Sequence, residues 1–278
     1  MEAIQNQESE SIGIENPPFD FKKAFKDIWT GVKNWRVWFL LGWLDLRLRY
    51  RRSYLGPFWI TISMAVMIYS MGFIYGKIFH MNLAEYFLYI SGGMLAWYFL
   101  STTLIEMMNC FIDSTTFILQ VKMPFSTYIM RIITRNFIVL GHNVLAVIPL
   151  LFVFKCVPNF PLFFLALLIT TISMFSVGML FAMIGARFRD VPQVLTSLLQ
   201  VGFLLTPIMW RADMVPGRAI LAVYLNPFYY FVELIRSAVL NVSPPAIVYK
   251  GSVAIALAGT AIMLLFFSRF RHRIPFWV

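Results

Sequence analysis

The chain carries little charge for its length. Only 13% of its 278 residues are Asp, Glu, Lys or Arg, whereas 60% are hydrophobic. A soluble domain carries about 25% charged residues. The hydrophobic residues also form several runs that could each cross a bilayer, which takes about 20 residues per helix. The composition therefore excludes an ordinary soluble domain and predicts an all-α integral membrane protein.

The sequence also lacks the motifs of most enzyme chemistry. It contains no GxxxxGK[ST] loop, no HExxH and no GxSxG, so the chain cannot itself bind ATP in the P-loop manner. Its two cysteines, Cys110 and Cys156, lack metal-site spacing and are predicted at opposite membrane faces, which argues against a disulfide. We predict no metal site, no cofactor and no catalytic residue in this chain.

Few polar residues lie inside the predicted spans. Glu106 is near the cytoplasmic end of the second span, where we expect it to pair with a basic loop residue. His142 and Asn143 lie within the third span, where burial is costly without partners. We expect both to hydrogen-bond to a neighbouring helix, with a proton relay as the alternative. The acids are too few for a membrane hydrolase or an ion-coupled pump.

Positive charge, in contrast, is abundant and unevenly placed. If the N-terminus is cytoplasmic, 17 of the 23 Lys and Arg residues fall on the cytoplasmic side and six on the far side. This bias follows the positive-inside rule, so both termini are predicted to be cytoplasmic and a nucleic-acid partner is not needed to explain the charge. The six predicted spans are residues 58–79, 86–108, 132–154, 160–186, 191–209 and 253–267.

The segment before the first span divides into two parts. Residues 1–21 hold five acids and no Lys or Arg, and they have no apolar stretch typical of a signal peptide. We expect a mobile acidic cytoplasmic tail there. Residues 22–56 combine Trp and basic residues at helical spacing, which predicts an amphipathic interface helix in the headgroup layer. A soluble helix packed on a partner is the alternative.

The segment between the last two spans, about 210–248, is too apolar for a solvated loop and too interrupted by proline for a span. We interpret it as short re-entrant or interfacial helices on the far side, because such backbone is tolerated only where it packs against protein. With 57–278 as the transmembrane domain, the predicted fold is six spans, an N-terminal interface helix and these short helices.

Six segments, in order along the chain, resemble a known family. They are LRYRRSYLGP at 48–57, QVKMP at 120–124, ARFRDVPQ at 186–193, LTPIMW at 205–210, LNPFY at 225–229 and RHRIPFW at 271–277. The chain resembles the membrane (permease) subunits of polysaccharide-exporting ABC transporters, most of all the O-antigen exporter permeases of the Wzm type. Because all six occur at matching topological positions, the resemblance covers nearly the whole chain after residue 35.

The resemblance implies a homodimer in the bacterial inner membrane, bound to two copies of a separate ATPase subunit that holds ATP and Mg. It implies a lipid-linked polysaccharide as cargo, on an undecaprenyl pyrophosphate carrier, and periplasmic gate helices at about 210–248. Capsule or teichoic acid export by the same family is an alternative. An integral-membrane glycosyl or acyl transferase is an alternative of another class, and a structural scaffold is a third.

The resemblance also gives the predicted sites. A coupling loop at about 110–125 would dock on the ATPase, with a second contact after the fourth span; a short solvated loop and a simple anchor are the alternatives. The predicted coupling residues are Asp113, Gln120, Lys122, Arg187, Arg189 and Asp190. Guanidinium groups suit bidentate phosphate contact. The residues predicted to meet either the carrier pyrophosphate or ordinary headgroups are Arg47, Arg49, Arg51 and Arg52.

Aromatic residues make up 17% of the chain. Rings stack on the C–H faces of sugars without sequence-specific contacts, so aromatic side chains suit a conduit for a moving glycan, although most aromatics in such a chain face lipid or pack between helices. The predicted channel and gate residues are Tyr69, Phe73, Tyr75, Trp97, Tyr98, Trp210, Tyr224, Tyr229 and Tyr230.

Overall fold

The apolar runs form long helices in the computed structural model, which describes residues 19–278. Within that range, five helices are long and apolar enough to cross a membrane, so the all-helical membrane fold is confirmed. The tail predicted for 1–21 falls almost entirely outside the described residues. The five long helices are α4 (Phe58–Ile78), α5 (Leu83–Asp113), α7 (Phe125–Val153), α8 (Phe160–Arg187) and α12 (Ala246–Phe270).

The span predicted at 191–209 is shorter than expected. Its helix, α9 (Val191–Leu205), has 15 residues. At 1.5 Å per residue α9 is about 22 Å long, less than the hydrocarbon thickness of about 30 Å. Thr206 has an extended backbone conformation, and Pro207 cannot continue the helix. Residues 206–209 therefore do not extend α9. The prediction of six full spans thus becomes five long helices and one short one.

Three of the long helices extend beyond their predicted limits. The second and third spans were predicted at 86–108 and 132–154, whereas α5 continues to Asp113 and α7 begins at Phe125. The last helix, α12, starts seven residues before the predicted 253. Apolar content underestimates α7 because its first turns carry Arg131, whose charge is paired with Asp45.

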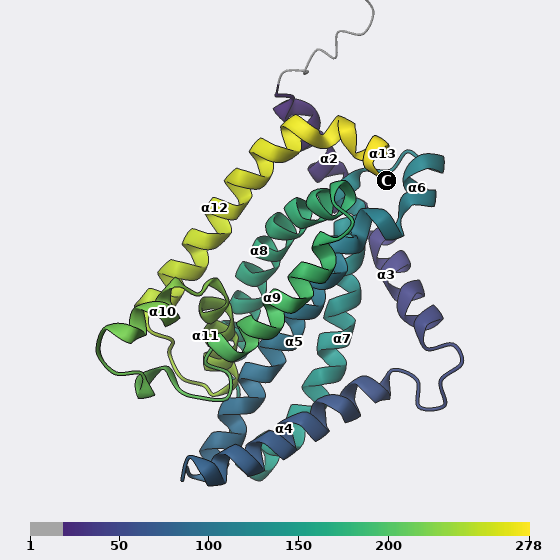
Figure 1. The fold of residues 1–278 in the computed structure, drawn as a ribbon. Helices are drawn as coiled ribbons and strands as arrows, with labels where there is room; N and C mark the ends of the chain where they lie inside the picture. Colours follow the sequence, from purple (N-terminus) through teal and green to yellow (C-terminus); the bar gives the residue numbers. More distant parts are fainter. Residues whose placement is uncertain (1–18) are drawn as a thin grey trace, which may run out of the picture.

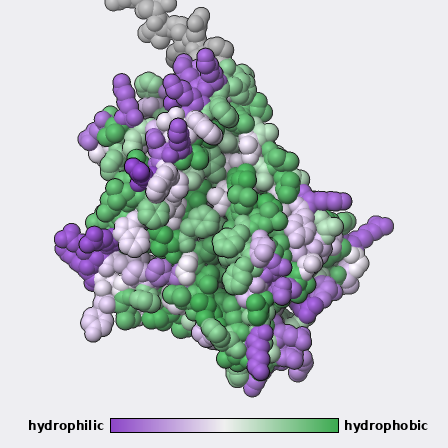
Figure 2. All heavy atoms as spheres, turned by 180° about the vertical axis from the view of Figure 1, so that it is seen from behind, coloured by the Kyte–Doolittle hydropathy of each residue, from purple (hydrophilic) through white to green (hydrophobic). Residues whose placement is uncertain are grey.

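Helix α5 forms the centre of the molecule (Figure 1). It packs against α8 on one side and α7 on the other, and 72% of its most apolar window is buried, against 17% for α4. Small residues permit the close approach of α8: a Cβ at Gly185 would collide with the Met108 carbonyl, and one at Gly178 with the Met107 sulfur. The space-filling view shows hydrophobic side chains over the middle of one face and hydrophilic ones toward its margins (Figure 2).

Short helices gather at two opposite ends of the long ones (Figure 1). We call these the α6 end and the α11 end. The α6 end holds α2 (Phe21–Lys33), α6 (Thr115–Gln120), the 3-10 turn η3 (Arg271–Arg273) and α13 (Ile274–Trp277). The α11 end holds the two 3-10 turns η1 (Ala212–Met214) and η2 (Gly217–Ala219), together with α10 (Ile220–Leu225) and α11 (Pro227–Val239).

The region predicted as one interface helix contains two, α2 and α3 (Trp35–Arg49), separated at Asn34. Asp20 caps the N-terminus of α2, because its side chain accepts the Lys23 N–H at 2.9 Å. Helix α3 packs on α7, where Gly42 lies so close to the Arg131 carbonyl that a Cβ would meet it at 2.9 Å. Large aromatic side chains on both helices stay exposed, among them Trp29, Trp35 and Trp43.

One buried carboxylate joins three segments at the α6 end. Asp27 of α2, 4% exposed, accepts the backbone N–H groups of Phe125 at 3.2 Å and Ser126 at 3.1 Å, and so satisfies free donors at the start of α7. The same carboxylate pairs with Arg271 at 2.9 Å. Asp27 therefore fixes α2 and the C-terminal segment to the transmembrane helices.

We expect Asp27→Ala to lower the stability of the folded state by about 2–3 kcal/mol, because it leaves two buried N–H groups without an acceptor and removes the ion-pair partner of Arg271. Thermal unfolding in detergent measures the change. Asp20→Ala is the matched control, since it removes the partly exposed carboxylate just before the same helix. Among residues 19–278 that carboxylate pairs only with Lys23. Equal melting temperatures for the two variants would contradict the assigned role.

Candidate functional site

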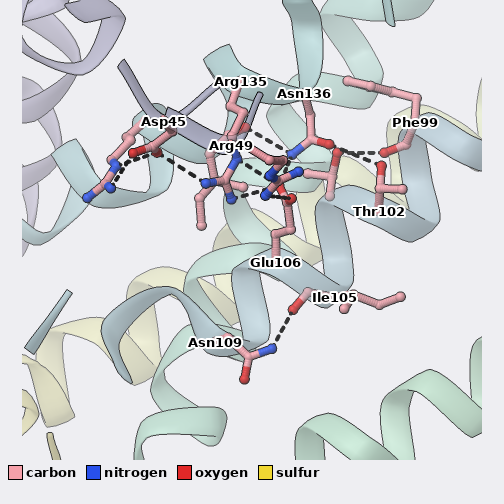
Figure 3. Close-up of polar contacts among 12 residues, drawn as sticks. Asp45, Arg49, Phe99, Thr102, Ile105, Glu106, Asn109, Arg135 and Asn136 are labelled. Atoms are coloured by element: carbon pink, nitrogen blue, oxygen red, sulfur yellow. Dashed lines mark hydrogen bonds and ion pairs between the residues drawn. The ribbon is translucent and has the colours of Figure 1, made fainter. Parts of the chain in front are cut away.

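A ladder of alternating charges links three helices toward the α6 end (Figure 3). Asp45 of α3 receives two hydrogen bonds from Arg131 of α7, at 2.7 and 2.6 Å. Arg135, one turn further along α7, contacts Asp45 at 3.1 Å and Glu106 of α5 at 2.8 Å. Arg49 of α3 completes the ladder by pairing with Glu106 at 2.9 Å. Each carboxylate therefore lies between two guanidinium groups.

The ladder continues toward the middle of the helices through neutral polar groups. Asn136 donates to Glu106 at 2.6 Å, and Thr102 donates to the amide oxygen of Asn136 at 3.0 Å (Figure 3). The Asn136 amide therefore bridges a carboxylate and a hydroxyl, and both its nitrogen and its oxygen have a hydrogen-bond partner. Glu106 pairs with basic residues as predicted, but Arg49 and Arg135 belong to helices and not to loops.

The burial of its side chains decides how much the ladder contributes to the stability of the fold. The side chains of Asp45, Glu106, Arg131 and Arg135 are 12–19% exposed, whereas Arg49 is 46% exposed. Removing one partner from a buried pair costs about 3–5 kcal/mol, since the remaining charge loses its compensation. Exposed pairs contribute about 0–1 kcal/mol. The Asp45–Arg131–Arg135–Glu106 part therefore holds α3 against α5 and α7, and Arg49 adds less.

The four arginines predicted near the headgroups differ in their surroundings. Arg49 belongs to the ladder, while Arg47, Arg51 and Arg52 are exposed and have no acidic side chain within ion-pair distance in the described part of the chain. Arg51 and Arg52 follow α3, in the turn that leads through Gly56 to α4. The positive φ of Gly56, +56°, permits that reversal without steric cost. Three guanidinium groups are therefore available for an external partner.

All six predicted coupling residues are exposed, and they lie around two connections at the α6 end. Asp113, Gln120 and Lys122 flank or end α6. The other three, Arg187, Arg189 and Asp190, form the turn between α8 and α9. Helix α13 packs against both α6 and α8, so these two connections share one end of the molecule. Within residues 19–278, no hydrogen bond or ion pair joins the two groups directly.

The predicted channel aromatics divide into two sets. On α4, Tyr69 donates to the Ala146 carbonyl at 3.2 Å, Phe73 lies under the Lys77 ammonium, and Tyr75 stacks on Phe79. Those contacts fix α4 to its neighbours or to itself. On α5, Trp97 is 7% exposed and packs edge-on against Phe228 of α11, while Tyr98 is partly buried.

The gate aromatics gather around α10 and α11. The ring centroids of Tyr224 and Tyr229 are 5.9 Å apart, and those of Tyr229 and Tyr230 are 5.5 Å apart. Tyr230 also donates to the Tyr224 carbonyl at 2.6 Å. Trp210 donates to the Leu204 carbonyl at 3.1 Å, closing the end of α9. The three tyrosines therefore pack as one group, whereas Trp210 contacts the end of α9 and Trp97 packs on Phe228 of α11.

A buried arginine at the α11 end was missed by the sequence analysis. Arg236 of α11 is fully buried and donates to Glu233 at 2.7 Å, to the Tyr89 hydroxyl at 2.8 Å and to the Pro207 carbonyl. Its guanidinium lies 2.5 Å from where a Cβ of Gly93 would be, so only glycine leaves room for it. Arg236 thus connects α11 to α5 and to the end of α9.

Other expectations for polar residues in the spans were wrong. The His142 ring contacts the Ile138 carbonyl of its own helix at 2.8 Å, and the buried amide oxygen of Asn143 has no hydrogen-bond partner among the described residues. The predicted bonds to a neighbouring helix are therefore not made by these side chains. Thr61 of α4 instead donates to the His142 backbone carbonyl at 2.9 Å. Cys110 is a buried free thiol and Cys156 a partly buried one.

The spacing of charged residues in the sequence could have predicted the charge ladder. Asp45 and Arg49 are four residues apart, as are Arg131 and Arg135, so each pair lies on one face of a helix. Two such pairs beside spans, together with the lone acid Glu106, indicate an interhelical network. Arg236 offered a similar signal, since Glu233 precedes it by one turn.

Comparison with known proteins agrees with a multi-pass membrane domain whose charges lie at its ends. The family model described as "ABC-2 type transporter" matches residues 36–240, from α3 to the end of α11. The chain belongs to the ABC-2 type transporter family. It is a permease subunit, and permeases of this family pair with ATPase subunits. Its 278 residues contain no P-loop, in keeping with an ATPase supplied by a partner.

Two curated relatives are O-antigen export system permease proteins RfbA from Klebsiella pneumoniae. One is 23% and the other 24% identical to this chain over 243 residues. Each alignment covers 82% of this chain and 90% of the relative. The similarity is therefore distant in sequence but extends over nearly the whole length of both proteins.

We expect Glu106→Gln to loosen α3, because it removes the charge that pairs with Arg135 and Arg49. Hydrogen exchange of residues 35–49 should become at least about tenfold faster, the equivalent of about 1.4 kcal/mol in local opening. Glu85→Gln, at the exposed N-terminal turn of α5, is the control and should leave that exchange unchanged. Equal exchange in both variants would show that the ladder does not hold α3.

Proposed function

We propose that this chain is the transmembrane subunit of an ATP-driven exporter that moves a lipid-linked polysaccharide from the cytoplasmic to the periplasmic side of a bacterial inner membrane. The observation that carries the proposal is the similarity to O-antigen export permeases over 82% of the chain. The cargo is of the O-antigen type on an undecaprenyl pyrophosphate carrier. Capsule or teichoic acid export is the alternative within the family.

In this proposal the α6 end is cytoplasmic and docks on the ATPase. The exposed residues around α6 and around the α8–α9 turn supply its polar contacts. Helix α6 begins at Thr115, immediately after the central helix α5 ends, so a displacement of α6 acts directly on the most buried helix of the fold. Two copies of the chain and two ATPase subunits form the working complex.

In this proposal the three exposed arginines without an acidic partner bind the carrier lipid. Arg47, Arg51 and Arg52 lie where α3 turns toward the membrane, and the pyrophosphate of the carrier is a dianionic or more highly charged group. Each guanidinium can offer two parallel hydrogen bonds to a phosphate. Arg49 differs, because Glu106 already neutralises it. We assign the carrier contact to the other three, with headgroup anchoring as the alternative.

The glycan would pass the aromatic residues that line the proposed path. Tyr229 and Tyr230 belong to α11 and Tyr224 to α10, and α11 would act as a gate on the periplasmic side. Polymer units of different linkage can slide over ring faces, because stacking needs no fixed hydrogen-bond pattern. This explains why a single permease could move a long chain of repeats.

We expect deletion of the gene for this chain to abolish the surface glycan while the lipid-linked glycan accumulates inside the cell, because synthesis precedes export. Immunoblotting of whole and permeabilised cells measures both pools. A glycosyl or acyl transferase would give a different result, namely loss of the glycan from both pools. The identity of the missing surface polymer distinguishes O-antigen from capsule or teichoic acid.

A second, biochemical experiment tests the docking surface for the ATPase. An ATPase subunit should co-purify with this chain, and a cysteine placed at Gln120 should crosslink to it, whereas one placed at exposed Asn241 at the α11 end should not. Purification without any ATPase, or crosslinks from Asn241 alone, would contradict the assigned docking surface.

Replacing the free arginines tests the carrier contact separately. We expect Arg51→Gln combined with Arg52→Gln to lower export several-fold at unchanged membrane insertion, since a phosphate loses its bidentate donors. Lys22→Gln combined with Lys33→Gln removes the same charge from exposed sites on α2 and is the control. Equal export by the two double variants would leave these arginines as headgroup anchors only.

A further inference from the structure

An apolar groove opens between α7 and α8 at the α11 end, away from both the charge ladder and the gate aromatics. Its volume is about 570 Å³. Val147 and Leu151 of α7 form one wall and Phe160 and Phe163 of α8 the other, while Val239 of α11 lies among the lining residues. Apolar walls of this kind bind water poorly, so the groove suits an apolar occupant.

A single charged side chain lines this groove. Lys155 lies in the turn between α7 and α8, with a φ of +51° that a non-glycine residue seldom adopts. In the described part of the chain, no acidic side chain lines the groove or lies within ion-pair distance of the Lys155 ammonium. The ligand should therefore combine an apolar chain with an anionic group.

The surroundings place the Lys155 ammonium at the level of lipid headgroups. Phe152, Val153 and Val157 are 80%, 71% and 69% exposed on either side of it. Exposed apolar residues of this size face lipid in a membrane helix, and a lysine at the end of such a helix directs its ammonium to the interface. Anionic headgroups attract a lysine there by electrostatics.

We propose that the groove holds one acyl chain of an anionic glycerophospholipid whose phosphate contacts the Lys155 ammonium. A glycerophospholipid is the occupant because this surface faces the bulk bilayer, where such lipids are the most abundant apolar ligands. The proposal is independent of what the transporter moves.

The bound lipid would act on α11 through the turn between α7 and α8, which contacts both the lipid and α11. The Asn159 N–H donates to the Ala238 carbonyl of α11 at 2.9 Å, and the Cys156 thiol contacts the Val239 carbonyl at 3.6 Å. A ligand that fills the groove supports this turn and, through it, the end of α11. Since a ligand that binds only the folded state stabilises it, occupancy should raise the melting temperature.

The test uses the full-length protein, delipidated in detergent and then supplied with phosphatidylglycerol or phosphatidylethanolamine of equal chain length. Native mass spectrometry counts bound lipid, and thermal unfolding measures stabilisation. We expect one phosphatidylglycerol to remain bound with an affinity about five-fold above that for phosphatidylethanolamine, the equivalent of about 1 kcal/mol for one lysine.

Two variants separate the headgroup contact from the groove. Lys155→Gln should abolish the preference for phosphatidylglycerol and keep a bound lipid, whereas Ile148→Trp, which fills the groove from its partly exposed wall, should lower the binding of both lipids. Lys250→Gln removes an exposed lysine from α12 outside the groove and should behave as the unaltered protein.

Three outcomes would overturn the proposal. One is an unchanged phosphatidylglycerol preference in Lys155→Gln. Another is stronger competition by undecaprenyl phosphate than by phosphatidylglycerol, which would assign the groove to the carrier lipid. The third is a change of oligomeric state in Ile148→Trp without any change in lipid binding, which would assign the groove to a second copy of the chain.

Discussion

The structure depends on the requirement that charges beside the hydrocarbon layer be paired. Asp45 and Glu106 lie among helices that are otherwise apolar, and each is held between two guanidinium groups. An unpaired carboxylate at that depth would cost several kcal/mol. Because Asp45 comes from α3 and Glu106 from α5, while Arg131 and Arg135 come from α7, satisfying these charges also fixes the positions of the three helices.

Asp27 meets the same requirement at the α6 end. Its carboxylate takes the place of solvent at the start of α7 and pairs with Arg271. Two separate carboxylate clusters therefore attach α2 and α3, which are exposed on much of their surface, to the buried helices. Helices α2 and α3 are thus held by electrostatics and hydrogen bonds, and many of their large apolar side chains stay exposed.

Much of the architecture could be predicted from composition, because apolar runs and the placement of Lys and Arg reflect the membrane directly. The limits of the helices could not. Arg131 lies just outside the predicted third span, yet α7 begins before it and passes through it, because Asp45 of α3 compensates its charge. Residues 206–209 were counted as part of a span, yet Thr206 and Pro207 end α9. The first error arises because a count of apolar residues cannot include contacts made far away in sequence. The second arises because such a count overlooks the local effect of a proline.

The fit of Arg236 against Gly92 and Gly93 has a mechanical consequence. A long cationic side chain occupies space that exists only because two neighbouring residues of α5 have no side chain. If α11 rotated about its own axis or slid by one residue, the guanidinium would strike the α5 backbone. Helix α11 and the first half of α5 are therefore locked against rotation and sliding relative to each other, so they keep one fixed register.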